Sequence, residues 1–324
     1  MLYDQAQLAS LYLEAFKITE REYYATTARS ILDYVLEKLT HSEGGFYCGE
    51  DADSMNEHGH KSEGAFYVWK QSGMSPSVHV DLQVEISDLF KDDELNERIA
   101  INVFGIQKGG NVDPQHDIRD ELAGYNVLRN RIRTREKQEQ AAASWGITTE
   151  ELKSRVATIK KRMYEYREKR IRPHLDDKIV VEWNGLMISA FAKAGILLKE
   201  PRYLEAAEKA ARFIQENMWN GTNLMRSYRL GPSSIGAFSA DFASLIAGLL
   251  ELYRATFSVT WLKFAAKLQA TMDVLFWDPI HGGYLSHDKS DPYVISITKS
   301  FEESVMPSTV SCNCKTSSHS YRMA

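Results

Sequence analysis

The sequence of 324 residues is poor in cysteine and has no long apolar run. Its three cysteines, Cys48, Cys312 and Cys314, are too few for a disulfide framework, so we expect a reducing compartment and a cytoplasmic protein. The longest apolar stretch, residues 242–252, is too short and too interrupted to cross a bilayer. Met1 opens directly into an amphipathic segment without a signal-peptide pattern. We therefore expect no membrane partner.

The sequence also lacks an excess of charge of one sign. It has 39 basic and 44 acidic side chains, for a formal net charge of -5. Two basic runs, 129–135 and 160–162, are interleaved with or followed by glutamates, which is typical of a solvated helix face. These features predict that the chain has no nucleic-acid partner.

Cofactor and metal signals are missing as well. No glycine-rich loop of the kind that cradles phosphates occurs, so we expect no nucleotide cofactor. Asp51 and Asp53 occupy the first and third places of a calcium loop, but Met55 and Asn56 then stand where an oxygen ligand and a glycine are needed. We expect no metal site.

What the sequence does contain is a repeat. Three segments that begin near Leu11, Ile196 and Leu249 share a helical stretch, a short break, a second helical stretch and an aromatic-bearing turn. Counted from Tyr24, Leu204 and Leu262, equivalent places carry the same residue kinds. The fifth place is basic in all three copies, as Arg29, Lys209 and Lys267. The fifteenth is large and apolar, as Leu39, Trp219 and Trp277, and the twentieth opens a turn, at Gly44, Leu224 and Gly282. The middle copy keeps the register without the glycines.

Apolar residues recur every three or four positions within these segments, which predicts amphipathic helices. Two such helices with a short connection form an antiparallel hairpin. Because one hairpin cannot bury its apolar face alone, the hairpins are expected to stack on one another as an arc or ring. The predicted fold is mainly α, with small β-hairpins at the loops.

Composition divides the chain into four parts. Residues 1–71 hold the first hairpin and its site loops, and residues 72–171 form a charged insertion. The insertion ends in a predicted helix capped at Thr148 and running to about Lys169. Residues 172–300 hold the further hairpins. Residues 301–324, rich in Ser and Thr and without periodicity, are predicted to be an irregular tail.

The first chemically unusual cluster follows the first repeat. Asp51 and Asp53 stand beside aromatic residues, a combination suited to sugar hydroxyls and to the apolar face of a sugar ring. A solvated, capped turn is the alternative. Trp69, at the end of the strand-like stretch 63–69, can stack on a pyranose ring, and core packing is its alternative role.

The densest cluster lies at 172–185. His174, Asp176, Asp177 and Glu182 are candidate acid–base groups, because titratable side chains beside apolar neighbours acquire shifted pKa values. We predict that these four side chains carry any catalysis. Within the same cluster Trp183 and Asn184 are candidate sugar contacts, although Asn184 can instead cap the following helix. Asp241 is a further candidate at the start of a later helix, where the helix dipole alone also favours an acid.

Four motifs in order then point to a family. They are residues 1–8 (Met-Leu-Tyr-Asp-Gln-Ala-Gln-Leu), residues 45–54, residues 63–69 (Glu-Gly-Ala-Phe-Tyr-Val-Trp), and residues 172–174 with 183–187. Together they resemble the spermatogenesis-associated protein 20 family from Met1 to about Tyr284. The resemblance implies a six-hairpin, glycosidase-like (α/α)6 toroid, here expected to be incomplete. It implies no settled reaction. Family members also carry a thioredoxin-like domain ahead of this segment, to which nothing in this sequence corresponds, so we expect no thiol-redox role.

The leading hypothesis is a carbohydrate-active or carbohydrate-binding toroid fragment with a sugar ligand. Its concave face would be lined by the acid–base candidates and by seven contact residues: Tyr3, Asp51, Asp53, Trp69, Trp183, Asn184 and Asp241. The alternative is a non-catalytic scaffold whose exposed helix faces bind a protein partner. Whether the chain is an enzyme stays open at this point.

Overall fold

The computed structural model describes residues 1–56, 59–70, 86–117, 121–288, 295–296, 298–300 and 305–309. Most of the predicted tail, 301–324, and the first residues of the predicted insertion, 72–85, therefore lie outside the described residues. The chain divides into two compact units, one formed by residues 1–49 and 175–324 and the other by residues 50–174. Each unit is considered by itself.

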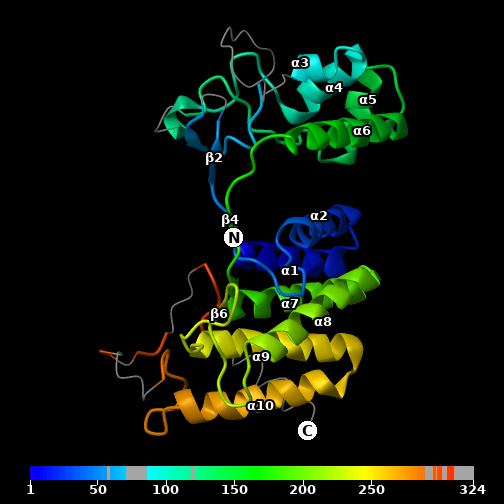
Figure 1. Ribbon diagram of the computed structural model, residues 1–324. Helices are drawn as coiled ribbons and strands as arrows, with labels where there is room; N and C mark the ends of the chain where they lie inside the picture. Colours follow the sequence, from blue (N-terminus) through cyan, green and yellow to red (C-terminus); the bar gives the residue numbers. More distant parts are fainter. Residues whose placement is uncertain are drawn as a thin grey trace. The chain divides into compact units, whose positions relative to one another are not determined.

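The first unit consists of three helical hairpins. They pair α1 (Leu2–Thr19) with α2 (Glu22–Lys38), α7 (Val181–Leu197) with α8 (Pro201–Asn217), and α9 (Ser239–Thr256) with α10 (Val259–Phe276). The central helix α7 packs against α1 on one side and against α9 on the other (Figure 1). The three first helices thus form one row, as the predicted stacking of hairpins requires, and the mainly α fold of the prediction is confirmed.

All three hairpins turn in the same way. Glu20, Lys199 and Phe257 each have a left-handed backbone, with φ of 55°, 56° and 54°, between the two helices of their hairpin. A non-glycine residue rarely adopts this conformation unless the surrounding structure fixes it. The repeated left-handed residue therefore marks the three connections as one recurring turn.

The turns after the second helices also repeat. Single antiparallel bridges join Thr40 to Phe46, Trp219 to Leu224 and Trp277 to Tyr284. These pairs fall at the fifteenth to twenty-second places of the predicted repeat. The register read from the sequence is therefore present in the structure, including the middle copy that has no glycines. The only strand pair wholly within the described part of this unit joins β5 (Ile179–Val180) to β6 (Ser227–Tyr228).

Close backbone contact joins α7 to α9. A Cβ added to Gly185 would lie 2.4 Å from the carbonyl carbon of Ser244, and one added to Gly248 would lie 2.4 Å from the carbonyl oxygen of Gly185. No larger side chain fits between these helices without moving one of them. The glycines therefore set how near the N-terminal ends of α7 and α9 come to each other.

The second unit combines short strands and helices. Strands β2 (Asp53–Met55) and β3 (Lys61–Glu63) pair in antiparallel register. The helices are α3 (Ile86–Leu89), α4 (Glu94–Phe104), the 3-10 turn η1 (Pro114–His116), α5 (Arg135–Ser144) and α6 (Thr149–Arg167). Strands β1 (Gly49–Glu50) and β4 (Leu175–Asp176) lie where the chain passes from one unit to the other. The hydroxyl of Thr148 accepts a 3.1 Å hydrogen bond from the backbone of Glu151, so the predicted cap of α6 is present.

The second unit begins at Glu50, earlier in the chain than the change of composition near residue 72. The reason lies in Trp69, which is 2% exposed in the core of this unit. The guanidinium of Arg170 stacks at 4.3 Å over the Trp69 ring and donates to the carbonyl oxygens of Phe66 and Val68. Residues 66–69 are thereby fixed to the end of α6.

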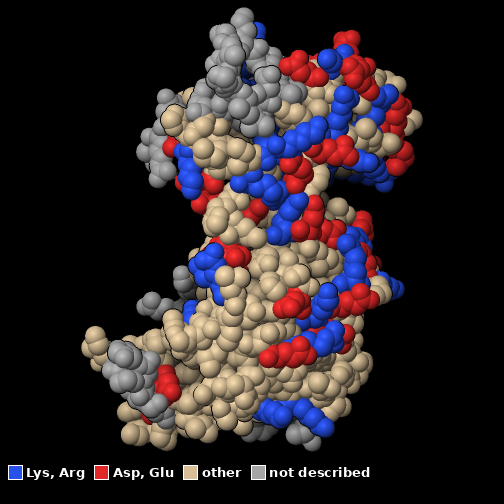
Figure 2. All heavy atoms as spheres, viewed as in Figure 1, with Lys and Arg blue, Asp and Glu red and all other residues tan. Residues whose placement is uncertain are grey.

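The surface carries both signs of charge. Figure 2 shows acidic and basic side chains interspersed on the visible face of each unit. Within the described ranges no helix is both long enough and apolar enough to cross a membrane.

Candidate functional site

The N-terminal ends of α7 and α9 meet at a buried cluster of charges. Asp241, in the first turn of α9, has no solvent exposure. Its Oδ1 accepts a 3.1 Å hydrogen bond from the backbone of Glu182, and its Oδ2 accepts bonds from the backbone of Phe238 (2.8 Å) and from Nη1 of Arg226 (2.9 Å). Asp241 thus joins α9 to the first turn of α7 and holds the guanidinium beside it.

Glu182 is the second residue of α7 and is 6% exposed. Burial raises the pKa of its carboxyl to about 7, the charge of Asp241 adds to the rise, and Arg226 opposes it. Burial likewise raises the pKa of Asp241 above its ordinary value, against the effect of Arg226 and the two backbone donors. Among the residues that the structure describes, none donates a hydrogen bond to the Glu182 carboxyl. This group therefore remains available to a ligand.

A cavity of about 290 Å³ opens in front of Glu182. Its wall combines charged, aromatic, hydroxyl and apolar side chains, all from the first unit: Glu182, Arg226, Phe238, Ser239, Ala240, Ser286, His287, Ser300, Val305, Met306, Pro307, Ser308 and Thr309. The ring of Phe238 contacts two of the polar groups, with the Arg226 guanidinium 4.4 Å and the His287 ring 4.9 Å from its centroid. We call this space the Glu182 cavity.

The other predicted site residues of the first unit lie around this cluster without lining the cavity. Tyr3 of α1 and Trp183 of α7 make an edge-to-face contact, with ring centroids 4.9 Å apart. Asn184 is buried one turn inside α7, and the N-cap position of that helix belongs to Val180. Its side-chain amide accepts a hydrogen bond from the backbone N–H of Phe46 and donates one to the backbone carbonyl of Phe46.

Asp176, at the end of β4, and Asp177, in the loop that follows it, both form ion pairs. Lys178 lies 3.2 Å from Asp176, and Nε of Arg229 lies 2.6 Å from Asp177. Both carboxylates are thus engaged by cations of the same unit, in contrast to Glu182.

Four predicted site residues belong to the second unit. The carboxylate of Asp51 accepts a 3.2 Å hydrogen bond from the backbone of Asp53, which is a local turn contact. The carbonyl of His174 accepts a bond from the backbone of Asp51, and the His174 side chain is exposed. Trp69 is buried in the core of this unit, which is the environment expected for core packing, the alternative role named for this residue above.

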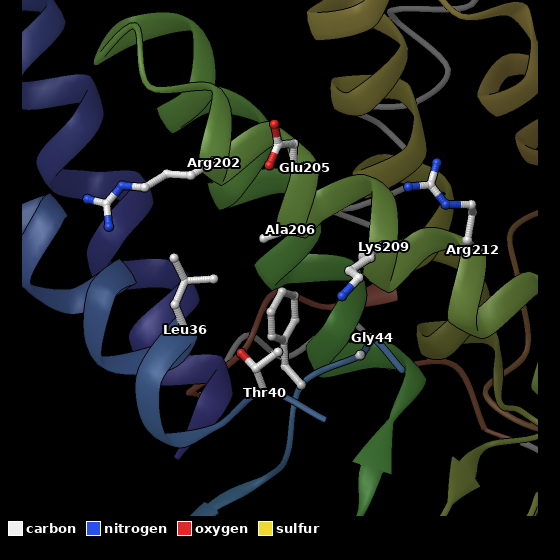
Figure 3. Close-up of a pocket in the computed structure, with 10 residues that line it drawn as sticks. Leu36, Thr40, Gly44, Arg202, Glu205, Ala206, Lys209 and Arg212 are labelled. Carbon is white, nitrogen blue, oxygen red and sulfur yellow. The ribbon is translucent and has the colours of Figure 1, made fainter. Parts of the chain in front are cut away.

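A second cavity of the first unit, about 350 Å³, lies between α2 and α8 (Figure 3). Its wall includes Arg202, Lys209 and Arg212 from α8, and Thr40 and Gly44 from the turn after α2. Arg202 already pairs with Asp33 and Glu200, each at 2.8 Å. None of the predicted site residues lines this space.

Sequence reasoning missed Arg226, Phe238 and His287. All three come from loops that follow the repeated turns: Arg226 stands two places after Leu224, and His287 five places after Gly282. The position of the repeated turns was the available sequence signal for them.

Within the described ranges no group of three His, Cys, Asp or Glu side chains is placed to hold a metal ion.

Comparisons with known proteins define the family. No protein-family model matches the chain. Human spermatogenesis-associated protein 20 is 36% identical over 295 residues, which cover 88% of this chain and 36% of the human protein. The uncharacterized protein B0495.5 of Caenorhabditis elegans is 35% identical over 303 residues, covering 90% of this chain and 40% of that protein.

Among solved structures, a D-mannose isomerase is 13% identical, with a TM-score of 0.36 over 88% of this chain and 63% of the isomerase. The GH76 α-mannanase BT2949 of Bacteroides thetaiotaomicron is 13% identical, with a TM-score of 0.35 over 100% of this chain and 70% of the mannanase. No reaction follows from likenesses of this degree. This chain spans little more than a third of the length of the curated relatives it matches, at 36% and 40%, and it belongs to the spermatogenesis-associated protein 20 family.

Proposed function

We propose that the first unit binds a carbohydrate in the Glu182 cavity and that Glu182 donates or accepts a proton there. The observation that carries this proposal is the state of the Glu182 carboxyl. It is buried, it faces a cavity, and no described residue satisfies it with a hydrogen bond or ion pair. Burying such a group without a partner is costly, and a ligand hydroxyl removes the cost.

The dimensions of the cavity suit a small ligand. Its volume of about 290 Å³ stands at the lower end of the range of roughly 300–1,000 Å³ for small-molecule sites. We therefore expect one sugar ring, or the terminal ring of a longer sugar, to enter. Phe238 offers an aromatic surface, and Ser239, Ser286 and Ser300 offer hydroxyl groups.

The acid–base chemistry follows from the pKa of Glu182. A carboxyl with a pKa of about 7 is divided between its acid and its base form near neutral pH, which is the condition for proton transfer in either direction. Of the four acid–base residues predicted from the sequence, Glu182 is the one that lines the cavity. Asp176 and Asp177 are held by Lys178 and Arg229, and we assign them no proton transfer.

Calorimetric titration with D-glucose, D-mannose, N-acetyl-D-glucosamine and cellobiose tests the proposal. At least one sugar should bind the wild-type chain, and Glu182→Gln should weaken that binding by about tenfold or more, because a charge-capable hydrogen-bond partner is removed. Glu205→Gln is the matched control, since Glu205 lines the second cavity. Absence of binding by every sugar, or equal weakening in both variants, would overturn the proposal.

A second candidate function is protein interaction. Large apolar side chains are exposed at both ends of α10, including Phe257 and Val274, each 78% exposed, and Ile280, 83% exposed. Such residues favour a partner surface when they are contiguous. Concentration-dependent association in light scattering, removed by Val274→Lys and Ile280→Lys together, would support this function.

A further inference from the structure

We propose that His287 is a second proton-transfer residue of the Glu182 cavity, acting on the same ligand as Glu182. This inference rests on the proposed function and extends it, because it pairs Glu182 with a histidine that was not among the acid–base candidates predicted from the sequence. His287 lines the cavity together with Glu182 and comes from the loop after α10.

The backbone beside His287 is fixed to the start of α9. The carbonyl of Ser286 accepts hydrogen bonds from the backbone and the hydroxyl of Ser239, at 3.3 and 3.4 Å. The backbone N–H of Ser286 donates to the carbonyl of Thr298 at 2.8 Å. His287 is therefore held at the same helix end that carries Asp241, and α7 places Glu182 at that end.

The ring of His287 is also oriented. It meets the ring of Phe238 at an interplanar angle of 63°, with the centroids 4.9 Å apart. Its Nδ1 is buried and has no hydrogen-bond partner among the described residues. A buried ring nitrogen without a partner is uncommon in proteins, and in the wall of a cavity it marks a position for a ligand group.

The charges around the pair are distributed over several elements. Asp241 on α9 and Arg226 after the middle turn neutralise each other at 2.9 Å. Lys299 is held by Asp278 at 2.7 Å and by the carbonyl of Gly282 at 2.6 Å. Glu182 is thus the cavity-lining carboxyl that no cation of the described residues contacts directly.

Two such groups move protons without a further reagent. The Glu182 carboxylate takes a proton from one atom of the ligand, and the His287 imidazolium gives a proton to another atom. The ligand loses one proton and gains one, so its charge and oxidation state are unchanged. Solvent then returns Glu182 to the carboxylate and His287 to the imidazolium. The ligand class is a sugar that undergoes internal proton movement.

The first test needs no ligand. The ring ¹⁵N chemical shifts of His287 are measured by NMR at one pH in the wild-type chain, Glu182→Gln and the control Glu205→Gln. Because Glu182 and His287 line the same cavity, Glu182→Gln should move the His287 ring shifts, and the control, at the other cavity, should leave them unchanged. Equal shifts in all three proteins would overturn the pairing, whether or not a sugar binds.

The second test uses solvent deuterium. D-glucose and D-mannose are incubated in D₂O with the wild-type chain, His287→Asn, Glu182→Gln and the exposed control His281→Asn, and carbon-bound deuterium is measured by NMR. Uptake should fall at least tenfold in His287→Asn and in Glu182→Gln, and remain in His281→Asn. Sugar binding without uptake in the wild-type chain would overturn the pair while leaving the proposed binding function intact.

Discussion

The side-chain amide of Asn184 and the backbone of Phe46 exchange two hydrogen bonds. Oδ1 of Asn184 accepts from the N–H of Phe46 at 2.7 Å, and Nδ2 donates to the carbonyl of Phe46 at 2.9 Å. A third bond joins Nδ2 to the carbonyl of Val180 at 2.9 Å. The amide therefore joins the turn after α2 to the first turn of α7, which carries Glu182.

This relationship predicts a large effect for Asn184→Asp. One carboxylate oxygen keeps the N–H of Phe46, but the oxygen that replaces Nδ2 faces the carbonyl oxygens of Phe46 and Val180 without a donor. We therefore expect a loss of about 3 kcal/mol in the free energy of unfolding, measured by urea denaturation. Asn223→Asp, at an exposed turn position, is the control and should change the free energy by less than about 0.5 kcal/mol. Similar losses in the two variants would contradict a fastening role for Asn184.

The fold could be predicted where it depends on local periodicity. Apolar spacing and the equivalent places after Tyr24, Leu204 and Leu262 indicated three hairpins, and these hairpins are present. Thr148 was identifiable as a cap because capping depends on neighbouring residues alone. The inclusion of Trp69 in the second unit depends instead on Arg170, about a hundred residues away, and no local pattern reports such a contact.

Some residues of the candidate site could likewise be identified from the local sequence, and others are placed by tertiary packing. Glu182 and Asp241 were identifiable as acids at helix starts. Arg226 and His287 reach the cavity through loops whose course depends on tertiary packing, so the sequence offered the turn register as a signal for them but not their place in the cavity wall. The sequence also gave no distance between α7 and α9, which Gly185 and Gly248 set.

Gly185→Ala should therefore destabilise the first unit. An alanine inside a helix normally stabilises it by about 1 kcal/mol relative to glycine. Here the added Cβ would lie 2.5 Å from both the carbonyl oxygen of Ser244 and the backbone nitrogen of Leu245, so we expect a loss of about 3 kcal/mol instead. Thermal unfolding measures the change, and Gly236→Ala, with open space around its Cα, is the control. A neutral or stabilising Gly185→Ala would show that the helices are farther apart.

Arg170→Lys should loosen residues 61–70. Burial lowers the pKa of the Arg170 guanidinium to about 10, so it is charged at neutral pH, and no described carboxylate contacts it. Lysine keeps the charge but loses the planar stacking on Trp69 and the paired bonds to Phe66 and Val68. We expect hydrogen exchange in peptides covering 61–70 to accelerate about tenfold, with little change in the exposed control Lys169→Met. Unchanged exchange would mean that the guanidinium contributes nothing specific.

Glu182 should make folding stability depend on pH. The pKa of its carboxyl is about 7 in the folded chain against an ordinary value of 4.5, so the folded state binds this proton more tightly than the unfolded state does. The free energy of unfolding must then fall as pH rises from about 4.5 to about 7, and level off above that. From the size of the shift, the fall is about 3 kcal/mol.

Urea denaturation of the wild-type chain and Glu182→Gln across this range isolates the contribution of Glu182, because glutamine does not titrate. As pH rises, the free energy of unfolding of the wild-type chain should fall relative to that of Glu182→Gln. The difference in this free energy between the wild-type chain and Glu205→Gln should not change with pH. If the difference in free energy of unfolding between the wild-type chain and Glu182→Gln also did not change with pH, the Glu182 carboxyl would titrate as it does in water. The buried charge cluster of Glu182, Asp241 and Arg226 would then be open to solvent, and the main support for proton transfer at this cavity would be lost.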